Sequence, residues 1–235
     1  MAWPNLGTVK TVLGISGTSE DTRLDMLITQ ACAAVRKYCG KDFDQTTYPW
    51  SPLDGVGDSG LYDGTGTPDI VLRQKPVSAV TSVWVDSSGR YGENPDGAFP
   101  STTLLTYGTD YVIRWDGCLP GSSTPCSYAG ILTRVNGVWP ARRQWVRGQI
   151  CSTRATGLGN VKVAYTAGYP DIPSDLAMAV CELVAFARRN INKGGSMTNE
   201  SLGAYSYTMA TAVAGSFPEL LSARQLMASY RSIPI

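Results

Sequence analysis

Two stretches with the three-to-four-residue period of an amphipathic helix lie near opposite ends of this chain, and residues 45–166 separate them. Each stretch has one apolar face that needs a partner, and packing the two faces together leaves the middle segment as an insert. The apolar positions are Leu24, Leu27, Ile28, Ala31, Val35 and Tyr38 in the first stretch, and Leu176, Ala179, Val180, Leu183, Val184 and Ala187 in the second. We therefore expect an α+β fold with a discontinuous helical core, residues 1–44 and 167–235.

Helix-capping signals set the expected ends of these segments. A short helix over residues 8–13 should stop at Gly14, and Ser19 should cap the long helix that ends at Gly40. In the C-terminal part, Asp171 or Ser174 can begin a helix. Residues 196–215 are small and polar and are expected to form a loop. The last helix should begin with a capping box of Ser216 and Glu219.

The middle segment, residues 45–166, has the texture of an antiparallel β-rich region. Short β-prone runs alternate with Gly, Pro, Ser, Thr and Asp. In the strongest run, Val83 and Val85 should share one face, with Val80, Ser82 and Trp84 on the other. The expected strands are 70–72, 77–85, 111–113, 131–135, 145–146 and 161–165. Residues 51–69 and 86–106 are expected to be long loops.

The residue types argue against most enzymes. The 235 residues include no histidine, which excludes Ser–His–Asp and Cys–His catalysis and the common zinc motifs. The glycine pairs lie in turn contexts rather than in phosphate-binding loops. The acidic loop with Asp54, Asp58, Asp63 and Asp69 lacks the ligand spacing of a calcium loop, so a solvated loop is expected. We expect no catalytic residue, no cofactor and no metal.

The six cysteines include no C-x-x-C pair. Cys32, Cys39 and Cys181 lie in expected helices and should be buried thiols. Cys118 and Cys126 flank a loop and leave two possibilities open, free thiols or a disulfide. The N-terminus shows no export signal, which favours the thiols, and no apolar run is long enough to span a membrane.

Charge is divided between two blocks, although the net charge is only +1. The acidic block contains Asp54, Asp58, Asp63 and Asp69, and the basic block contains Arg134, Arg142, Arg143, Arg147, Arg154 and Lys162. Three interpretations remain open. The blocks can neutralise each other within one subunit, the acidic patch can face the basic patch of a neighbouring copy, or the basic patch can face a DNA backbone.

Several pieces of the sequence, in order, resemble the head–tail connector (adaptor or head-completion) proteins of long-tailed bacteriophages. The clearest is the strand of residues 161–169 with its Tyr165-x-x-Gly168-Tyr169 end, followed by a proline and a helix. The other pieces are residues 8–15, 19–41, 72–83, 111–114, 130–132, 136–140 and 172–189. Residues 51–69 and 86–106 are longer than the corresponding family segments.

The resemblance implies a structural virion protein of the neck, at the head–tail junction, assembled in the host cytoplasm. It implies a homo-oligomeric ring, commonly twelvefold, that binds the portal protein and a tail or head-closure protein. Genomic DNA would pass through the ring without sequence specificity, and no membrane is involved. Portal contacts of the family suggest an apolar anchor on the last helix: Leu220, Leu221, Leu226, Met227 and Tyr230. Completion of the subunit core is the alternative role of that helix.

Three alternatives to this function remain. A tail-terminator or tail-completion ring would commonly be sixfold. A β-rich ligand-binding module would need exposed aromatic residues on the long loops, with Trp50, Tyr62 and Tyr91 as candidates. An enzyme using Asp and Lys would need two carboxylates in one cleft.

Overall fold

The computed structural model describes residues 3–49, 58–86, 99–141, 144–146, 149–151, 157–192, 199–202, 205–208 and 218–231. The chain forms two compact units. Unit 1 contains residues 1–40 and 171–235, and unit 2 contains residues 41–170. The expected fold class is confirmed, because helices from both ends of the chain pack together and antiparallel sheets lie between them in sequence. The division into domains stays a prediction.

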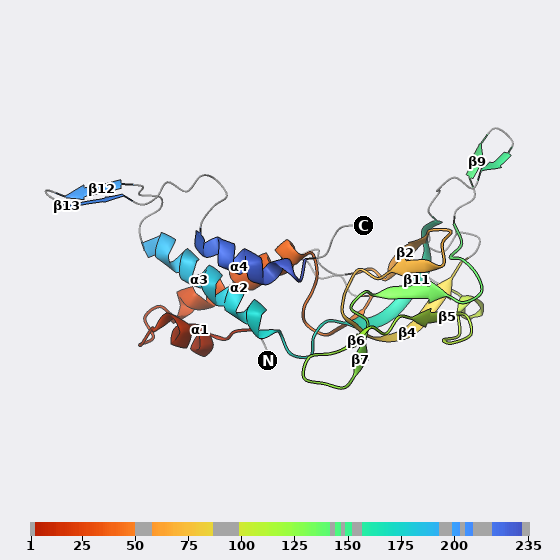
Figure 1. Cartoon of the computed structure of the whole chain (residues 1–235), viewed down its shortest axis with the longest axis horizontal. Coiled ribbons are helices and arrows are strands. Elements are labelled where there is room, and N and C mark those ends of the chain that lie inside the picture. The colour runs from red at the N-terminus through yellow and green to blue at the C-terminus, as the bar shows by residue number, and fades with distance from the viewer. Residues whose placement is uncertain are drawn as a thin grey trace. The chain divides into compact units, whose positions relative to one another are not determined.

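Unit 1 is built around one central helix. Its helices are α1 (Leu6–Leu13), α2 (Asp21–Cys39), α3 (Ser174–Asn192) and α4 (Pro218–Ala228). Helix α3 packs against the other three, as Figure 1 shows for α2 and α4. A hairpin of β12 (Asn199–Leu202) and β13 (Tyr205–Thr208) follows α3 in sequence. None of the helices in the described part of the chain is long and apolar enough to cross a membrane.

Most of the apolar stripe of α2 faces the core of unit 1 as expected, although Ile28 is only half-buried. Leu24, Leu27, Ala31 and Val35 are buried, but Tyr38 is 37% exposed. Cys39 takes the next core position and is completely buried. The reason is geometric, because a step of four residues from Val35 continues the stripe better than a step of three. The prediction of Tyr38 as a core residue was therefore wrong.

The ends of α1 and α2 are only partly as expected. Gly14 and Gly40 both adopt the left-handed conformation that ends a helix, with φ of 64° and 67°. Ser19 does not cap α2, because Glu20 occupies the N-cap position and makes no side-chain cap. The Asp21 amide donates to Thr18 O at 3.2 Å, so a tight turn replaces the expected cap.

The larger sheet of unit 2 is organised by one long strand, β11 (Gly157–Ala167). Strand β4 (Val77–Val85) pairs antiparallel along one side of β11. Strands β1 (Thr46–Tyr48) and β2 (Leu61–Gly64) pair antiparallel with the other side. The buried residues Val161, Val163, Tyr165 and Ala167 alternate along β11 and supply the core face of this sheet.

A second sheet completes the core of unit 2. It has the order β3 (Asp69–Val71), β8 (Ile131–Arg134), β5 (Tyr111–Ile113), all antiparallel. Its buried side chains join those of the larger sheet in a single hydrophobic cluster. Two hairpins and a short helix are added: β6 (Gly117–Cys118) with β7 (Pro125–Cys126), β9 (Gln144–Val146) with β10 (Gln149–Cys151), and the 3₁₀ helix η2 (Ser101–Thr103).

All six expected strands exist, but the sequence missed others. Residues 61–64 form β2 inside the expected loop 51–69, and residues 199–208 form a hairpin inside the expected loop 196–215. The first segment lies in a stretch rich in Gly and Asp, and the second contains Asn, Ser and Gly, so composition alone indicates turns in both. Residues 51–57 and 87–98 of the expected loops lie outside the described residues, as do Ser216 and the Gly194-Gly195 pair.

The predicted faces of β4 were also wrong in part. Val80 packs against the same hydrophobic cluster as Val83 and Val85, instead of on the opposite face. The register with β11 shifts between Ser82 and Val80, so Thr81 is an extra residue in the strand. Such a β-bulge reverses the phase of the alternation, which a two-residue period cannot anticipate.

Candidate functional site

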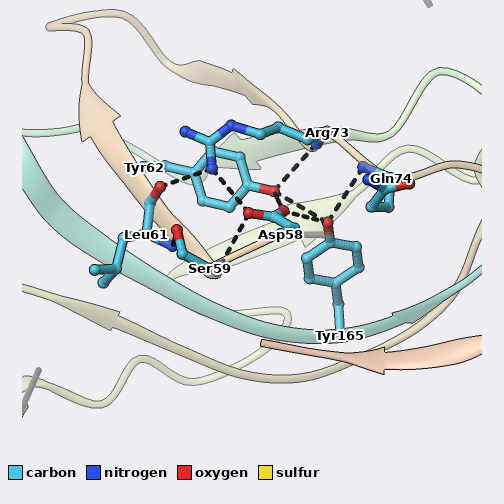
Figure 2. Close-up of polar contacts among 8 residues, drawn as sticks. Asp58, Ser59, Leu61, Tyr62, Arg73, Gln74 and Tyr165 are labelled. Carbon is cyan, nitrogen blue, oxygen red and sulfur yellow. Dashed lines mark hydrogen bonds and ion pairs between the residues drawn. The ribbon is translucent and has the colours of Figure 1, made fainter. Parts of the chain in front are cut away.

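A buried carboxylate lies at the centre of the polar contacts of unit 2. Asp58 is only 2% exposed, whereas the sequence predicted a solvated acidic loop. Its Oδ1 accepts hydrogen bonds from the Gly60 amide at 2.9 Å and from Arg73 Nη1 at 2.8 Å. Its Oδ2 accepts from the hydroxyls of Tyr62 and Tyr165 (Figure 2). The prediction failed because four donors satisfy the charge and make its burial tolerable.

The two tyrosines connect Asp58 to the segment after β3. The Tyr62 hydroxyl accepts from the Arg73 amide at 3.1 Å, and the Tyr165 hydroxyl accepts from the Gln74 amide at 3.2 Å. The Arg73 guanidinium lies 4.5 Å from the centre of the Tyr62 ring and also donates to Leu61 O at 2.9 Å. β2, β11 and residues 73–74 are thereby joined at one point (Figure 2).

This environment shifts three side-chain pKa values. Burial, followed by the negative charge of Asp58, raises the pKa of Tyr62 well above its ordinary value. Burial also raises the pKa of Tyr165, with the neighbouring Tyr62 and Asp58 adding to the effect. Burial is the largest single influence on Arg73 and opposes its charge, but the hydrogen bond to Asp58 and the charge interactions with Asp58 and the two tyrosines together outweigh burial and raise the pKa. Both tyrosines therefore stay neutral and Arg73 stays charged at any physiological pH.

The chemistry of the cluster is structural. Both oxygens of Asp58 already accept two donors each, so the carboxylate has little capacity left to bind or activate a further group. The described residues contain no group of three His, Cys, Asp or Glu side chains arranged to hold a metal ion. We interpret the cluster as an anchor that holds β2 and residues 73–74 against β11.

The rest of the predicted acidic patch is only partly visible. Asp63 is exposed and accepts from the Gly159 amide at 2.7 Å. Asp69 is exposed and accepts from Thr133 Oγ1 at 2.6 Å. Asp54 lies outside the described residues. Because Asp58 is buried and paired with Arg73, it cannot belong to a surface patch, and that part of the prediction was wrong.

The basic patch is represented by two residues in the described part of unit 2. Arg134 is half-buried with its guanidinium 5.7 Å from the centre of the Trp139 ring. Lys162 is half-buried, and its ammonium lies 5.5 Å from the Trp84 ring and 5.8 Å from the Phe99 ring. Both cations rest on aromatic faces. Arg142, Arg143, Arg147 and Arg154 lie outside the described residues.

The proposed portal anchor on α4 is partly engaged within unit 1. Met227 is 4% exposed and contributes to the core of the unit. The Tyr230 hydroxyl donates to both oxygens of Asp175, at 2.9 and 2.7 Å. Leu226 is half-buried, and the side chains of Leu220 and Leu221 lie outside the described residues. Met227 and Tyr230 thus have a role in the subunit, and portal binding by this helix stays a prediction.

Exposed aromatic residues occur where the sequence did not indicate them. Tyr107 is 51% exposed and Trp115 is 42% exposed, and Trp115 Nε1 donates to the Tyr107 hydroxyl at 3.2 Å. Tyr62, a candidate for ligand binding, is buried at 4% exposure, so that prediction was wrong. The other candidates, Trp50 and Tyr91, lie outside the described residues. The sequence feature that could have indicated the exposure of Trp115 is its position between two charged residues, Arg114 and Asp116.

Cys118 and Cys126 are free thiols on opposite faces of the β6–β7 ribbon. Cys118 pairs with Pro125 and Cys126 pairs with Gly117, so the two cysteines occupy neighbouring rather than facing positions. Cys118 is accordingly exposed and Cys126 buried. This register explains why the loop between them does not close as a disulfide. Cys39 and Cys181 are buried as expected, and Cys32 is half-buried.

Comparison with known proteins gives one family match and several similar solved structures. Residues 5–83 match the family of phage gp6-like head-tail connector proteins. No curated protein matches the chain. A chain from the neck of an empty gene transfer agent (GTA) particle, computed with C6 symmetry, is 16% identical at a TM-score of 0.50. That similarity covers 100% of this chain and 94% of the neck chain.

Two further solved structures are similar at a lower level. A chain from the neck of the native GTA particle, computed with C12 symmetry, is 15% identical at a TM-score of 0.46. A chain from the virion of the native particle is 17% identical at a TM-score of 0.42. Each covers 100% of this chain and 94% of its own.

The family match begins at the N-cap of α1 and continues through α2 into β4. It therefore includes the first helical stripe, Asp58 and its partners Tyr62 and Arg73. The family is one of structural connectors rather than enzymes, which agrees with the expectation from the residue types. Over residues 5–83, the chain is therefore similar to the phage gp6-like head-tail connector proteins.

Proposed function

We propose that this protein is a subunit of an oligomeric ring in the virion neck, where it connects the portal of the head to the tail. The observation that carries the proposal is the connector-family match over residues 5–83. The similarity in fold to a neck chain from a particle computed with C6 symmetry supports it over the whole length. We propose twelve subunits, because the connector family that the sequence resembles commonly forms twelvefold rings. A twelvefold ring also has sixfold symmetry, so it is compatible with a particle computed with C6 symmetry.

The proposed ring uses three surfaces. The portal contacts α4 through Leu226 and the chain end after Tyr230. The tail or a head-closure protein contacts the opposite end of the ring. The basic residues of unit 2, including Arg134 and Lys162, face either the genomic DNA in the channel or an acidic neighbour. Such contacts would stabilise the ring by mass action, so an isolated subunit can remain a monomer until a portal is present.

Class averaging of stained particles tests the ring directly. The protein is imaged alone and with purified portal rings, and its mass distribution is measured in parallel. Twelvefold rings, alone or only on portals, are expected. Sixfold rings that ignore the portal would favour a tail-terminator protein. A monomer that ignores every virion component would overturn the proposal.

Portal binding is tested on α4 with a matched pair of variants. Leu226→Asp should lower the fraction of subunits captured by portal rings at least tenfold, because it places a charge on a half-buried apolar position. Gln225→Glu, at the exposed neighbouring position, should bind as the native chain does. The thermal midpoint of each free variant is measured first, so that loss of binding is separated from unfolding. Equal capture of both variants would assign portal binding to another surface.

The charge of the channel is tested with Arg142→Glu combined with Arg143→Glu. If these residues face DNA, the double variant should form rings and fail to retain DNA. Loss of the ring would assign them to the contact between subunits.

One observation favours a second candidate function, that of a ligand-binding module. The exposed Tyr107–Trp115 pair has the aromatic surface that carbohydrate or host-surface binding would use. A glycan array with no bound glycan would argue against this function.

A further inference from the structure

Among the described residues, the edge of strand β4 that faces away from β11 is hydrogen-bonded only at its two ends. On the side away from β11, the Val77 amide donates to Ser127 O at 2.9 Å, and the Ser127 amide donates back at 2.8 Å. At the other end, the Leu105 amide donates to Val83 O at 2.8 Å. Between these contacts, no residue that the structure describes makes a backbone hydrogen bond to the outer side of residues 78–82. We call residues 78–82 the β4 window.

The β4 window lacks most of the features that normally protect a sheet edge. β4 contains no charged residue and no proline over its whole length. Ala79 and Thr81 are exposed, and Thr81 has no partner residue on β11 because of the bulge. Natural edge strands usually carry a lysine, a proline or a covering segment, because open backbone groups recruit other strands. An uncharged window with no backbone partner among the described residues is therefore suited to pairing with a further strand.

The β12–β13 hairpin of unit 1 has the complementary property. Its strands pair with each other, from Asn199 with Thr208 to Leu202 with Tyr205. Neither strand pairs with any other strand in the part of the chain that the structure describes. A two-stranded hairpin alone is marginally stable in water, and a third strand stabilises it. β13 consists of Tyr, Ser, Tyr and Thr, residues suited to a paired strand.

We propose that the β12–β13 hairpin of one subunit pairs with the β4 window of a neighbouring copy and extends its sheet. The window spans about the length of one four-residue hairpin strand. Each copy donates one hairpin and accepts one, which is a heterologous contact of the kind that closes a ring when the rotation between copies allows it. The choice of a second copy as donor rests on the proposed ring.

Hydrogen exchange of the full-length protein tests this pairing. Amide exchange is measured by mass spectrometry in the free subunit and in the portal-templated ring. If the hairpin pairs with the window, amide exchange should be at least tenfold slower in the ring than in the free subunit, both at residues 79–82 and at residues 199–208. Protection of the window without the hairpin would assign the window to another segment and overturn the proposal. Unchanged exchange at the window would overturn it as well.

A matched pair of lysine substitutions tests the window independently. Thr81→Lys places a charge in the window. Thr47→Lys places the same charge at an exposed position of β1, the strand that pairs with the other side of β11. Thr81→Lys should lower the fraction of assembled rings at least tenfold, whereas Thr47→Lys should leave it unchanged. Both should keep the native thermal midpoint as free subunits. Normal assembly of a folded Thr81→Lys protein would contradict the proposal.

A synthetic peptide separates this inference from the proposed function. A fluorescent peptide of residues 197–210 is added to the monomeric protein, and its binding is followed by anisotropy and by exchange at residues 79–82. Binding that protects the window, in a protein that never forms rings, would reject the ring and retain the pairing. Rings whose window neither binds the peptide nor gains protection would reject the pairing and retain the ring.

Discussion

At the scale of single residues, the main finding is a buried charge with a complete set of partners. Asp58 accepts from two tyrosine hydroxyls, an amide and the Arg73 guanidinium. A buried carboxylate without such donors would cost several kcal/mol, so the donors and the charge depend on each other. Removing one member therefore leaves the others unsatisfied. The free energy of unfolding should then fall by more than it would on loss of a single surface hydrogen bond.

Replacement of the charge should show this dependence. Asp58→Asn keeps the shape but presents an amide group to four donors, and should lower the free energy of unfolding by about 3 kcal/mol. Asp63→Asn is the control, because Asp63 is exposed and accepts from one amide, and should cost less than about 1 kcal/mol. Urea unfolding measures both values. Similar losses in the two variants would refute the anchoring role of Asp58.

The raised pKa values of Tyr62 and Tyr165 predict a loss of stability at alkaline pH. The unfolded chain releases these protons near pH 10, whereas the folded unit retains them. Stability is therefore full below pH 10 and falls above it, by about 1.4 kcal/mol per pH unit for each tyrosine. Urea unfolding between pH 8 and 11 measures the slope, compared with Tyr62→Phe, which should reduce it by about half. Equal slopes for the native protein and the variant would contradict the assignment.

At the scale of elements, the end of β11 depends on a glycine. Gly168 has a φ of 105°, and a Cβ built on it would lie 2.4 Å from Asp44 O. Its amide donates to Pro76 O at 2.9 Å, and the next amide, of Tyr169, donates to Phe43 O at 2.8 Å. The backbone of residues 43–44 and of Pro76 thus packs directly against the chain where it leaves the sheet. This geometry gives a physical reason for the glycine in the Tyr165-x-x-Gly168-Tyr169 segment.

Adding a methyl group at position 168 should strongly destabilise the fold. Gly168→Ala combines an unfavourable φ with a clash against backbone, and should lower the free energy of unfolding by at least about 3 kcal/mol. Gly121→Ala is the matched control, since Gly121 has a φ of 72° but open space around its Cβ, and should cost about 1 kcal/mol. Thermal unfolding of the two variants compares the values. A Gly168→Ala protein as stable as the control would refute the close approach.

At the scale of the whole molecule, charge separation predicts how assembly responds to salt. Asp63 and Asp69 are exposed acidic groups of unit 2, and Lys162 and Arg134 are half-buried basic groups of the same unit. If acidic and basic patches of neighbouring copies face each other, screening should weaken their attraction.

Ring assembly should therefore decline as ionic strength rises from about 0.05 to 0.5 M, where the Debye length falls from roughly 14 to 4 Å. Mass photometry measures the ring fraction at each salt concentration, and the thermal midpoint of the free subunit serves as the control. Assembly that is independent of salt would mean that subunits meet through apolar or backbone contacts, such as the β4 window.

Several elements could be predicted from local sequence, because their signals are local. The period of residues 24–35 depends only on helix geometry, and Gly14 and Gly40 end their helices through their own φ angles. β4 and β5 were predicted to the residue, since their β-branched runs end at turn residues. Strand β2 was missed because its nonlocal pairing with β11 outweighs its turn-like composition, and β12 and β13 were missed because Asn, Ser and Gly in their local hairpin indicate a loop.

By itself, the sequence determined the order of helical, β-rich and helical segments, the lack of histidine chemistry and the connector resemblance, because each follows from residue types and their spacing. Only the tertiary structure decided that Asp58 and Tyr62 are buried together, that Tyr165 meets them from β11, and that Cys118 and Cys126 point apart. These facts depend on strand register. A shift of one residue in pairing reverses which side chains are buried, and no single segment of the sequence encodes that register.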